Sequence, residues 1–95
     1  MFPEELFSII KDRFKKKPHG SYIATLHKGG LDRISQKVGE EAIEVVIASK
    51  NKDKGRLVYE LADLVFHTLI LMAYLNVSLN DLDEELKKRR NLPKE

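Results

Sequence analysis

The sequence predicts an all-α protein, a bundle of four to five helices that a second copy of the chain completes. Apolar residues recur at three- and four-residue steps in the two longest segments, which is the spacing of one helix face. Pro, Gly and capping residues separate these segments from two shorter ones. The 95 residues suffice for one small domain, 1–95, whose thin core would gain stability from a partner, a metal or a ligand.

The composition argues against several classes of partner and site. The net charge of +2 is too small to indicate a nucleic-acid partner. The chain has no cysteine, so disulfides and cysteine-bound zinc are excluded, as is common in a reducing compartment. The N-terminal MFPEELF is acidic rather than signal-like, and the apolar run from Leu64 to Leu75 is too short to span a bilayer. We expect a cytoplasmic protein with no membrane partner.

The first quarter of the chain predicts one helix and one irregular segment. Pro3, Glu4 and Glu5 suit a helix start, because proline is tolerated in the first turn and acids face the positive end of the helix dipole. This helix should run to about Lys16, and Pro18 closes it. Residues 16–30 have little periodicity and predict a loop with room for one short helical turn, ended by a Gly-Gly pair.

Three further helices are expected. The second spans Leu31–Lys50, and a turn at 51–55 leads to Asp53 as the N-cap of a third, Arg56–Asn76. The sequence SLND at 78–81 resembles a capping box and should start a fourth helix that ends near Arg90. Asn91 and Pro93 are expected to stop it.

The helix at 31–50 carries an unusual acidic arc. Glu40, Glu41 and Glu44 lie close together beside Lys37, although like charges at this spacing destabilise an isolated helix. Apolar strips flank the arc on both sides. They consist of Leu31, Ile34, Val38, Ala42 and Val45 on one side and Ile43 and Ile47 on the other. A merely solvated face would not carry the second strip, so we expect the acids to face another part of the protein.

The helix at 56–76 repeats this pattern. Its polar residues share one narrow sector, and nearly everything else on it is apolar, so the helix should be buried. That sector contains Arg56, Glu60, Asp63, His67 and Tyr74. Buried ionised carboxylates are costly unless they are paired or bound to a cation. Two acidic patches on neighbouring buried helices therefore predict a divalent metal site.

The residue types at this site indicate phosphate chemistry. An all-carboxylate site favours a hard cation, Mg²⁺ with Mn²⁺ as a substitute. Lys28, Arg33 and Lys37 are basic residues near the acids in sequence and could hold the remaining oxygens of a polyphosphate. The metal would neutralise phosphate charge and lower the pKa of a bound water that attacks phosphorus.

The histidines leave alternatives open. His67 is either a hydrogen-bonded core residue or a residue that orients a carboxylate or a phosphate. The Glu-x-x-His motif of di-iron bundles is absent, which disfavours iron oxidation. The basic runs at 15–17 and 87–90 are interpreted as solvated helix ends.

The segments SYIATLHKGGLDRISQKVGEEAIEVVIASK and LVYELADLVFHTLILMAYLNVSLNDLDEELKKR resemble the phosphoribosyl-ATP pyrophosphohydrolase family of histidine biosynthesis. This family is similar to MazG and the dimeric dUTPases, which share the signatures EExxE and ExxD. The likeness covers about Ser21 to Arg89. One departure is Ile23, where the family often has Thr, so a cap or a substrate contact could differ.

The resemblance implies a function and a set of site residues. The reaction would be Mg²⁺-dependent hydrolysis of phosphoribosyl-ATP to phosphoribosyl-AMP and pyrophosphate, carried out by a homodimer. The metal ligands would be Glu41, Glu44, Glu60 and Asp63. Glu40 would be a further ligand or the base that orients the attacking water. The substrate-binding residues would be Ser21, Tyr22, Lys28, Arg33, Lys37 and His67.

Two alternative functions remain. One is a housecleaning pyrophosphatase of the MazG type that acts on other NTPs or dNTPs, because an acidic cluster does not read the base. The other is a non-catalytic helical dimerisation module whose acids serve only as salt-bridge partners of Arg56 and Lys37. The homodimer has independent support, because one short chain has too few partners to cover a helix that is apolar nearly all round.

Overall fold

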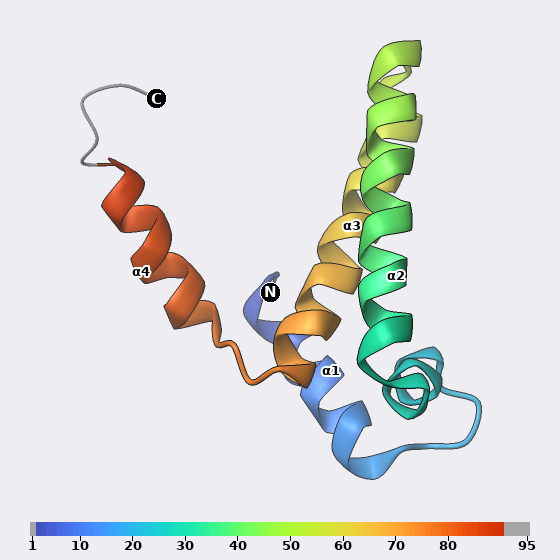
Figure 1. The fold of residues 1–95 in the computed structure, drawn as a ribbon, viewed down its shortest axis with the longest axis vertical. Coiled ribbons are helices and arrows are strands. Elements are labelled where there is room, and N and C mark those ends of the chain that lie inside the picture. Colours follow the sequence, from blue (N-terminus) through green and yellow to red (C-terminus); the bar gives the residue numbers. More distant parts are fainter. Residues whose placement is uncertain (1, 91–95) are drawn as a thin grey trace.

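The computed structural model describes residues 2–90, which form four α-helices and no strand. The helices are α1 (Glu4–Lys16), α2 (Tyr22–Asn51), α3 (Lys54–Tyr74) and α4 (Leu79–Arg90). Figure 1 shows α2 and α3 side by side and antiparallel, α1 across their lower end, and α4 standing apart. The predicted all-α class is confirmed. The two expected stop residues after Arg90 lie outside the described residues.

The core lies where α1, the start of α2 and the end of α3 meet. Ile10, Ile34 and Ile70 are fully buried, one from each of these helices. The other members of the core cluster are Phe7, Ile23, Leu26, Leu69 and Met72. Because Ile23 belongs to this cluster, the position where the family often has Thr contributes to packing, and the cap of α2 comes from Ser21 instead.

The predicted irregular segment at 16–30 is wrong for most of its length. Ser21 Oγ accepts a hydrogen bond from the Ala24 amide at 3.2 Å, which caps a helix that starts at Tyr22. Gly30 then takes φ 85° and ψ −175°, a conformation that is essentially restricted to glycine. The chain therefore forms two helical pieces that meet at a kink, with Gly30 as the corner.

The predicted helix ends elsewhere agree with the structure to within about two residues. Asp53 caps α3 by accepting a hydrogen bond from the Arg56 amide at 3.1 Å, so the helix begins at Lys54 rather than Arg56. Ser78 and Asp81 form the predicted capping box, in which each side chain accepts a hydrogen bond from the other residue's backbone amide.

The apolar surfaces of α2 and α3 were expected to be buried, and within this one chain they are buried only in part. Val58 and Leu61 on α3 and Ile43 and Ile47 on α2 are each between 41 % and 61 % exposed. Among residues 2–90, α3 is the one helix that is long and apolar enough to cross a membrane by length and composition alone. The expectation that no segment would be long enough considered only the apolar run from Leu64 to Leu75, which is shorter than the helix. Core helices of soluble proteins meet the same criterion, and α3 carries the buried polar residues Glu60 and His67.

Candidate metal and phosphate site

Three carboxylates from two helices converge in the middle of the α2–α3 pair. One carboxylate oxygen each from Glu41, Glu60 and Asp63 lies within 4.8 Å of the others. Glu60 is only 3 % exposed and Glu41 9 % exposed, so water does little to offset their mutual repulsion. Oxygen ligands alone suit Mg²⁺ or Mn²⁺. The donor set therefore fits a hard divalent cation.

Two basic residues neutralise part of this charge. Arg56 places a guanidinium nitrogen 2.7 Å from Glu60 Oε2, one helical turn away on α3. Lys37 Nζ lies 3.4 Å from Glu40 Oε1 and 3.3 Å from Glu41 Oε2 on α2. These are the salt bridges that a purely structural role would require, and the same cations are well placed to bind phosphate oxygens.

The charges at the rim of the cluster are held in their ionised forms. Burial lowers the pKa of the Lys37 ammonium, but its hydrogen bonds to Glu41 and Glu40 outweigh this, so the net pKa is raised. The pKa of Glu40 is lowered, first by a hydrogen bond from the Gln36 amide and then by Lys37. At neutral pH the site therefore keeps a cation and an exposed carboxylate next to each other.

The cluster lies in a shallow, open depression of about 430 Å³. Its lining residues are Lys37, Glu40, Glu41, Glu44, Arg56, Tyr59, Glu60 and Asp63. All come from α2 and α3, so the antiparallel helix pair alone builds the floor of the site. An open depression of this kind leaves room for phosphate oxygens beside the carboxylates.

A hydrogen-bonded chain connects the start of α2 to the acidic residues. His67 Nδ1 lies 2.8 Å from the backbone carbonyl of Asp63 and therefore donates to it. Its Nε2 lies 2.8 Å from the Tyr22 hydroxyl, which donates to it when the ring is the neutral Nδ1–H tautomer. His67, which is 3 % exposed, thus has both ring nitrogens hydrogen-bonded and fixes Tyr22 beside α3. It makes no contact with a carboxylate side chain.

Known proteins are similar to this chain over most of its length, including the residues of the site. Residues 4–90 match the family described as phosphoribosyl-ATP pyrophosphohydrolase. The chain belongs to this family. Phosphoribosyl-ATP pyrophosphatases from Clostridium botulinum strain Hall and from Methanococcoides burtonii are 47 % and 42 % identical to it. The first match covers 92 % of this chain and 79 % of the relative, and the second 92 % and 90 %.

A longer relative carries a similar sequence as one of its parts. The histidine biosynthesis bifunctional protein HisIE of Thermoanaerobacter pseudethanolicus is 48 % identical over 82 residues, 86 % of this chain but 38 % of that protein. The shorter relatives are named as pyrophosphatases, and the longer one is named as a bifunctional protein of histidine biosynthesis. The expected pyrophosphohydrolase family is therefore confirmed.

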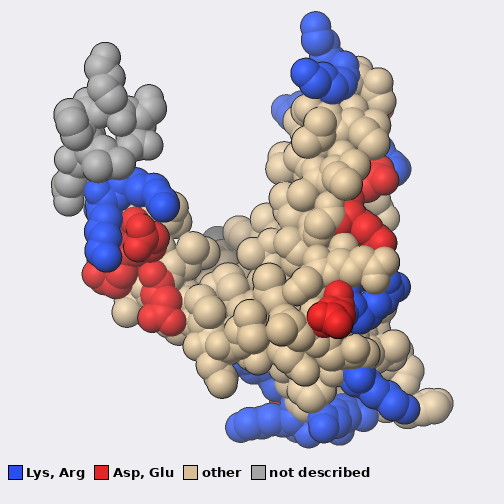
Figure 2. Space-filling model, viewed as in Figure 1, with Lys and Arg blue, Asp and Glu red and all other residues tan. Residues whose placement is uncertain are grey.

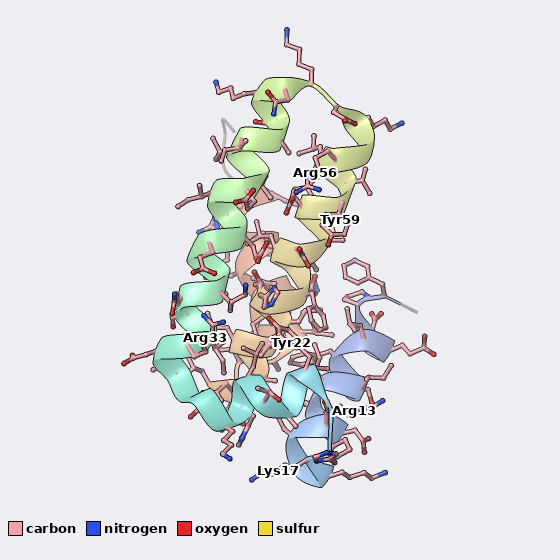
Figure 3. All side chains as sticks on the ribbon, turned by 90° about the vertical axis from the view of Figure 1, so that its right-hand side faces the viewer. Arg13, Lys17, Tyr22, Arg33, Arg56 and Tyr59 are labelled. Atoms are coloured by element: carbon pink, nitrogen blue, oxygen red, sulfur yellow. The ribbon has the colours of Figure 1, made fainter. Side chains whose placement is uncertain are left out.

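The structure separates the other expected site residues of this family member into three groups. Glu40 and Glu44 line the depression but are exposed, and Glu44 is not one of the three converging carboxylates. Burial raises the pKa of Tyr22, and Arg33 lies close enough to oppose part of this rise; Figure 3 shows both residues at the kinked end of the helix pair. Lys28 lines a separate depression with His19 and with Ser21, whose hydroxyl caps α2.

Two residues of the depression were not expected as substrate contacts. Arg56 and Tyr59 lie on α3 toward the α2–α3 turn, and the Arg56 Cζ is 5.3 Å from the Tyr59 ring centroid (Figure 3). Tyr59 is 60 % exposed. The sequence signal for Arg56 was its position four residues before Glu60 on the polar sector, whereas nothing in the apolar surroundings of Tyr59 singled it out.

Proposed function

We propose that this protein hydrolyses phosphoribosyl-ATP to phosphoribosyl-AMP and pyrophosphate, the second step of histidine biosynthesis. The observation that supports this most strongly is the buried three-carboxylate cluster inside a match that covers residues 4–90. The names of its relatives supply the substrate. We also propose a cytoplasmic location, because this substrate is an ATP derivative.

The proposed ligands of Mg²⁺ are Glu41, Glu60 and Asp63, with Glu44 at the edge of the same depression as a fourth. Mg²⁺ bound there would supply Lewis-acid stabilisation of the charge on the phosphate oxygens. Lys37 and Arg56 exchange part of their present contacts with carboxylates for contacts with these oxygens. The chain thus contributes both the ligands and the cations that a triphosphate-like substrate needs.

Glu40 is suited to the attacking water. Its carboxylate is exposed, and its lowered pKa keeps it ionised, so it can accept a hydrogen bond from a water molecule and orient it. The water oxygen forms a bond to the α-phosphorus, the bond from that phosphorus to the bridging oxygen breaks, and pyrophosphate leaves with those electrons, while the proton lost by the water passes to Glu40 or to solvent. Tyr22 and Arg33 lie at the other end of the acidic surface, where they would contact the rest of the substrate, and the buried His67 would hold Tyr22 in place.

The proposed active form is a homodimer. Ile43, Val46 and Ile47 on α2 and Val58 on α3 are at least 50 % exposed in the single chain. Removing this apolar surface from water would favour association by about 25 cal/mol per Å² buried, before the costs of association are subtracted. Light scattering at micromolar concentration tests this, and a monomer would contradict it.

Product analysis tests the reaction. Purified protein with Mg²⁺ should release pyrophosphate, not orthophosphate, from phosphoribosyl-ATP. A panel of ordinary NTPs and dNTPs should be hydrolysed at least about 100-fold less efficiently, a difference of about 2.7 kcal/mol in transition-state stabilisation. Preference for an ordinary dNTP would instead assign a housecleaning pyrophosphatase. Absence of hydrolysis of every nucleotide would favour a dimerisation module.

A further inference from the structure

Helix α4 touches the rest of its own chain chiefly at its first residue, Leu79, which packs against the core. Extensive packing among the described helices joins only α1, α2 and α3, and no residue of α4 is buried. Leu82 and Leu86 on α4 remain 43 % and 51 % exposed. Figure 1 shows α4 and the α2–α3 pair as two arms of a V, with the start of α1 between them. A twelve-residue helix with two exposed leucines would be marginal in isolation.

The connection between α3 and α4 is nevertheless well defined. Asn76 adopts the left-handed conformation at φ 58°, and the Val77 amide donates a 2.8 Å hydrogen bond to the Met72 carbonyl, as in a Schellman motif. The capping box of Ser78 and Asp81 starts α4 directly afterwards. Local hydrogen bonds therefore aim α4 away from its own chain.

An apolar groove lies between the start of α1 and the helix α3, and it is long enough to receive the exposed leucines of α4. It has a volume of about 370 Å³ and is lined only by apolar side chains: Phe2, Leu6, Val58, Leu61, Ala62 and Val65. Its α3 residues span seven positions, a rise of about 10 Å, which leaves room for Leu82 and Leu86, whose rise along α4 is about 6 Å. Figure 2 shows an uncharged surface between the charged faces of the two arms.

The charges at the ends of the two surfaces are complementary. The first turn of α1, beside the groove residues Phe2 and Leu6, carries the acids Glu4 and Glu5. The last turn of α4 carries four basic residues, at 87–90, and three of these, all but Arg90, also form ion pairs with acids one turn earlier on α4. A helix that enters the groove with its basic end toward α1 would bring opposite charges together, which favours one orientation.

We propose that a second copy of this chain occupies the groove: α4 of one copy lies against the groove of the other, and the reverse. This rests on the homodimer proposed above, and it specifies which surfaces meet. The interface is isologous, since each copy gives one helix and receives one. Leu82 and Leu86 fill the partner's groove, and the amphipathic helix is recognised by its apolar face.

Cysteine cross-linking tests the exchange cleanly, because the chain has no cysteine of its own. Leu61→Cys and Leu86→Cys are made in separate chains, which are produced together and oxidised mildly. A disulfide-linked heterodimer is expected in the mixture, and little cross-linking in either variant alone. Glu84→Cys is the matched control, because a residue two positions from both Leu82 and Leu86 faces away from them, and it should not cross-link with Leu61→Cys.

The outcomes separate the exchange from the dimer and from the activity. A dimer by light scattering without the heterodisulfide, or efficient self-cross-linking of Leu61→Cys, overturns the exchange and leaves the dimer intact. A monomer overturns both. Phosphoribosyl-ATP hydrolysis is assayed on the unmodified protein in every case, so loss of the proposed function would be seen independently of the cross-linking result.

Discussion

The Tyr22 hydroxyl and His67 Nε2 lie 2.8 Å apart, which joins residues 45 positions apart in the sequence. Tyr22→Phe removes the donor and leaves a buried imidazole nitrogen without its partner. We expect the free energy of unfolding to fall by about 1–3 kcal/mol, measured by urea denaturation. Tyr59→Phe is the control, since the exposed Tyr59 should change stability by no more than about 0.5 kcal/mol. Equal stability of the two variants would mean that the Tyr22–His67 bond contributes nothing.

The same pair predicts a dependence on high pH. Burial raises the pKa of Tyr22 above its ordinary value of 10.0, although Lys37 and Arg33 oppose this. A raised folded-state pKa means that the contribution of Tyr22 to stability is complete below pH 10 and is lost as the pH rises through the folded value. The tyrosinate absorbance of the native protein minus that of Tyr22→Phe should show one tyrosine ionising above pH 10. Ionisation at or below pH 10 would contradict the prediction.

Removing the charge of a proposed ligand should abolish turnover while the fold survives. Asp63→Asn and Glu60→Gln are expected to lower kcat by about 100-fold or more, because each removes a carboxylate that holds the metal. Glu44→Gln should also lower it, since Glu44 lines the same depression. Asp83→Asn on α4 serves as the control and should keep full activity. Circular dichroism verifies folding, and near-normal rates for Asp63→Asn would exclude it as a ligand.

Divalent cations should stabilise the folded protein. A cation that binds only the folded state adds about 2.7 kcal/mol at one hundred times its dissociation constant, so the melting temperature should rise with Mg²⁺ or Mn²⁺. Sodium chloride at equal ionic strength controls for screening. Asp63→Asn should melt at the same temperature with and without Mg²⁺. If the native protein shows no rise, the carboxylates bind no cation, and Glu41 and Glu60 serve as salt-bridge partners of Lys37 and Arg56.

The kink in α2 requires glycine at one position and not at a nearby one. Gly30→Ala places a side chain at φ 85°, ψ −175°, and should lower stability by about 1–3 kcal/mol. Gly39→Ala lies within regular helix with no atom within 4 Å of the added methyl group, and should raise stability by about 0.5–1 kcal/mol. Thermal melts of both variants make the comparison, and opposite signs are the expected result.

The sequence predicted the elements whose signals are local. Asp53, Ser78 and Asp81 form the expected caps because capping depends on neighbours three residues away. The helix before Gly30 was missed, since Pro18 and the Gly-Gly pair suggest a break and do not reveal that the break is a single corner. The fold class needed only periodicity, which the long helices display clearly.

The site was predicted in its centre and less well at its edges. Glu41, Glu60 and Asp63 converge as expected, because their positions on the polar sectors of two adjacent helices bring them together. The location of Lys28 depends on the direction in which the chain leaves Gly30, which no local pattern determines. The exposed Ile43 shows the same limit, because a single sequence does not reveal what covers an apolar strip.

The hydrogen bonds that join α3 to α4 also affect how readily chains can assemble. They link residues that are neighbours in sequence, so they can form in a single newly made chain. A disordered tail that folds only on contact loses about 2–5 kcal/mol or more of its binding energy to ordering. Caps that favour the helical form of α4 before contact reduce this entropic penalty, so that a given apolar contact would contribute more to the proposed association.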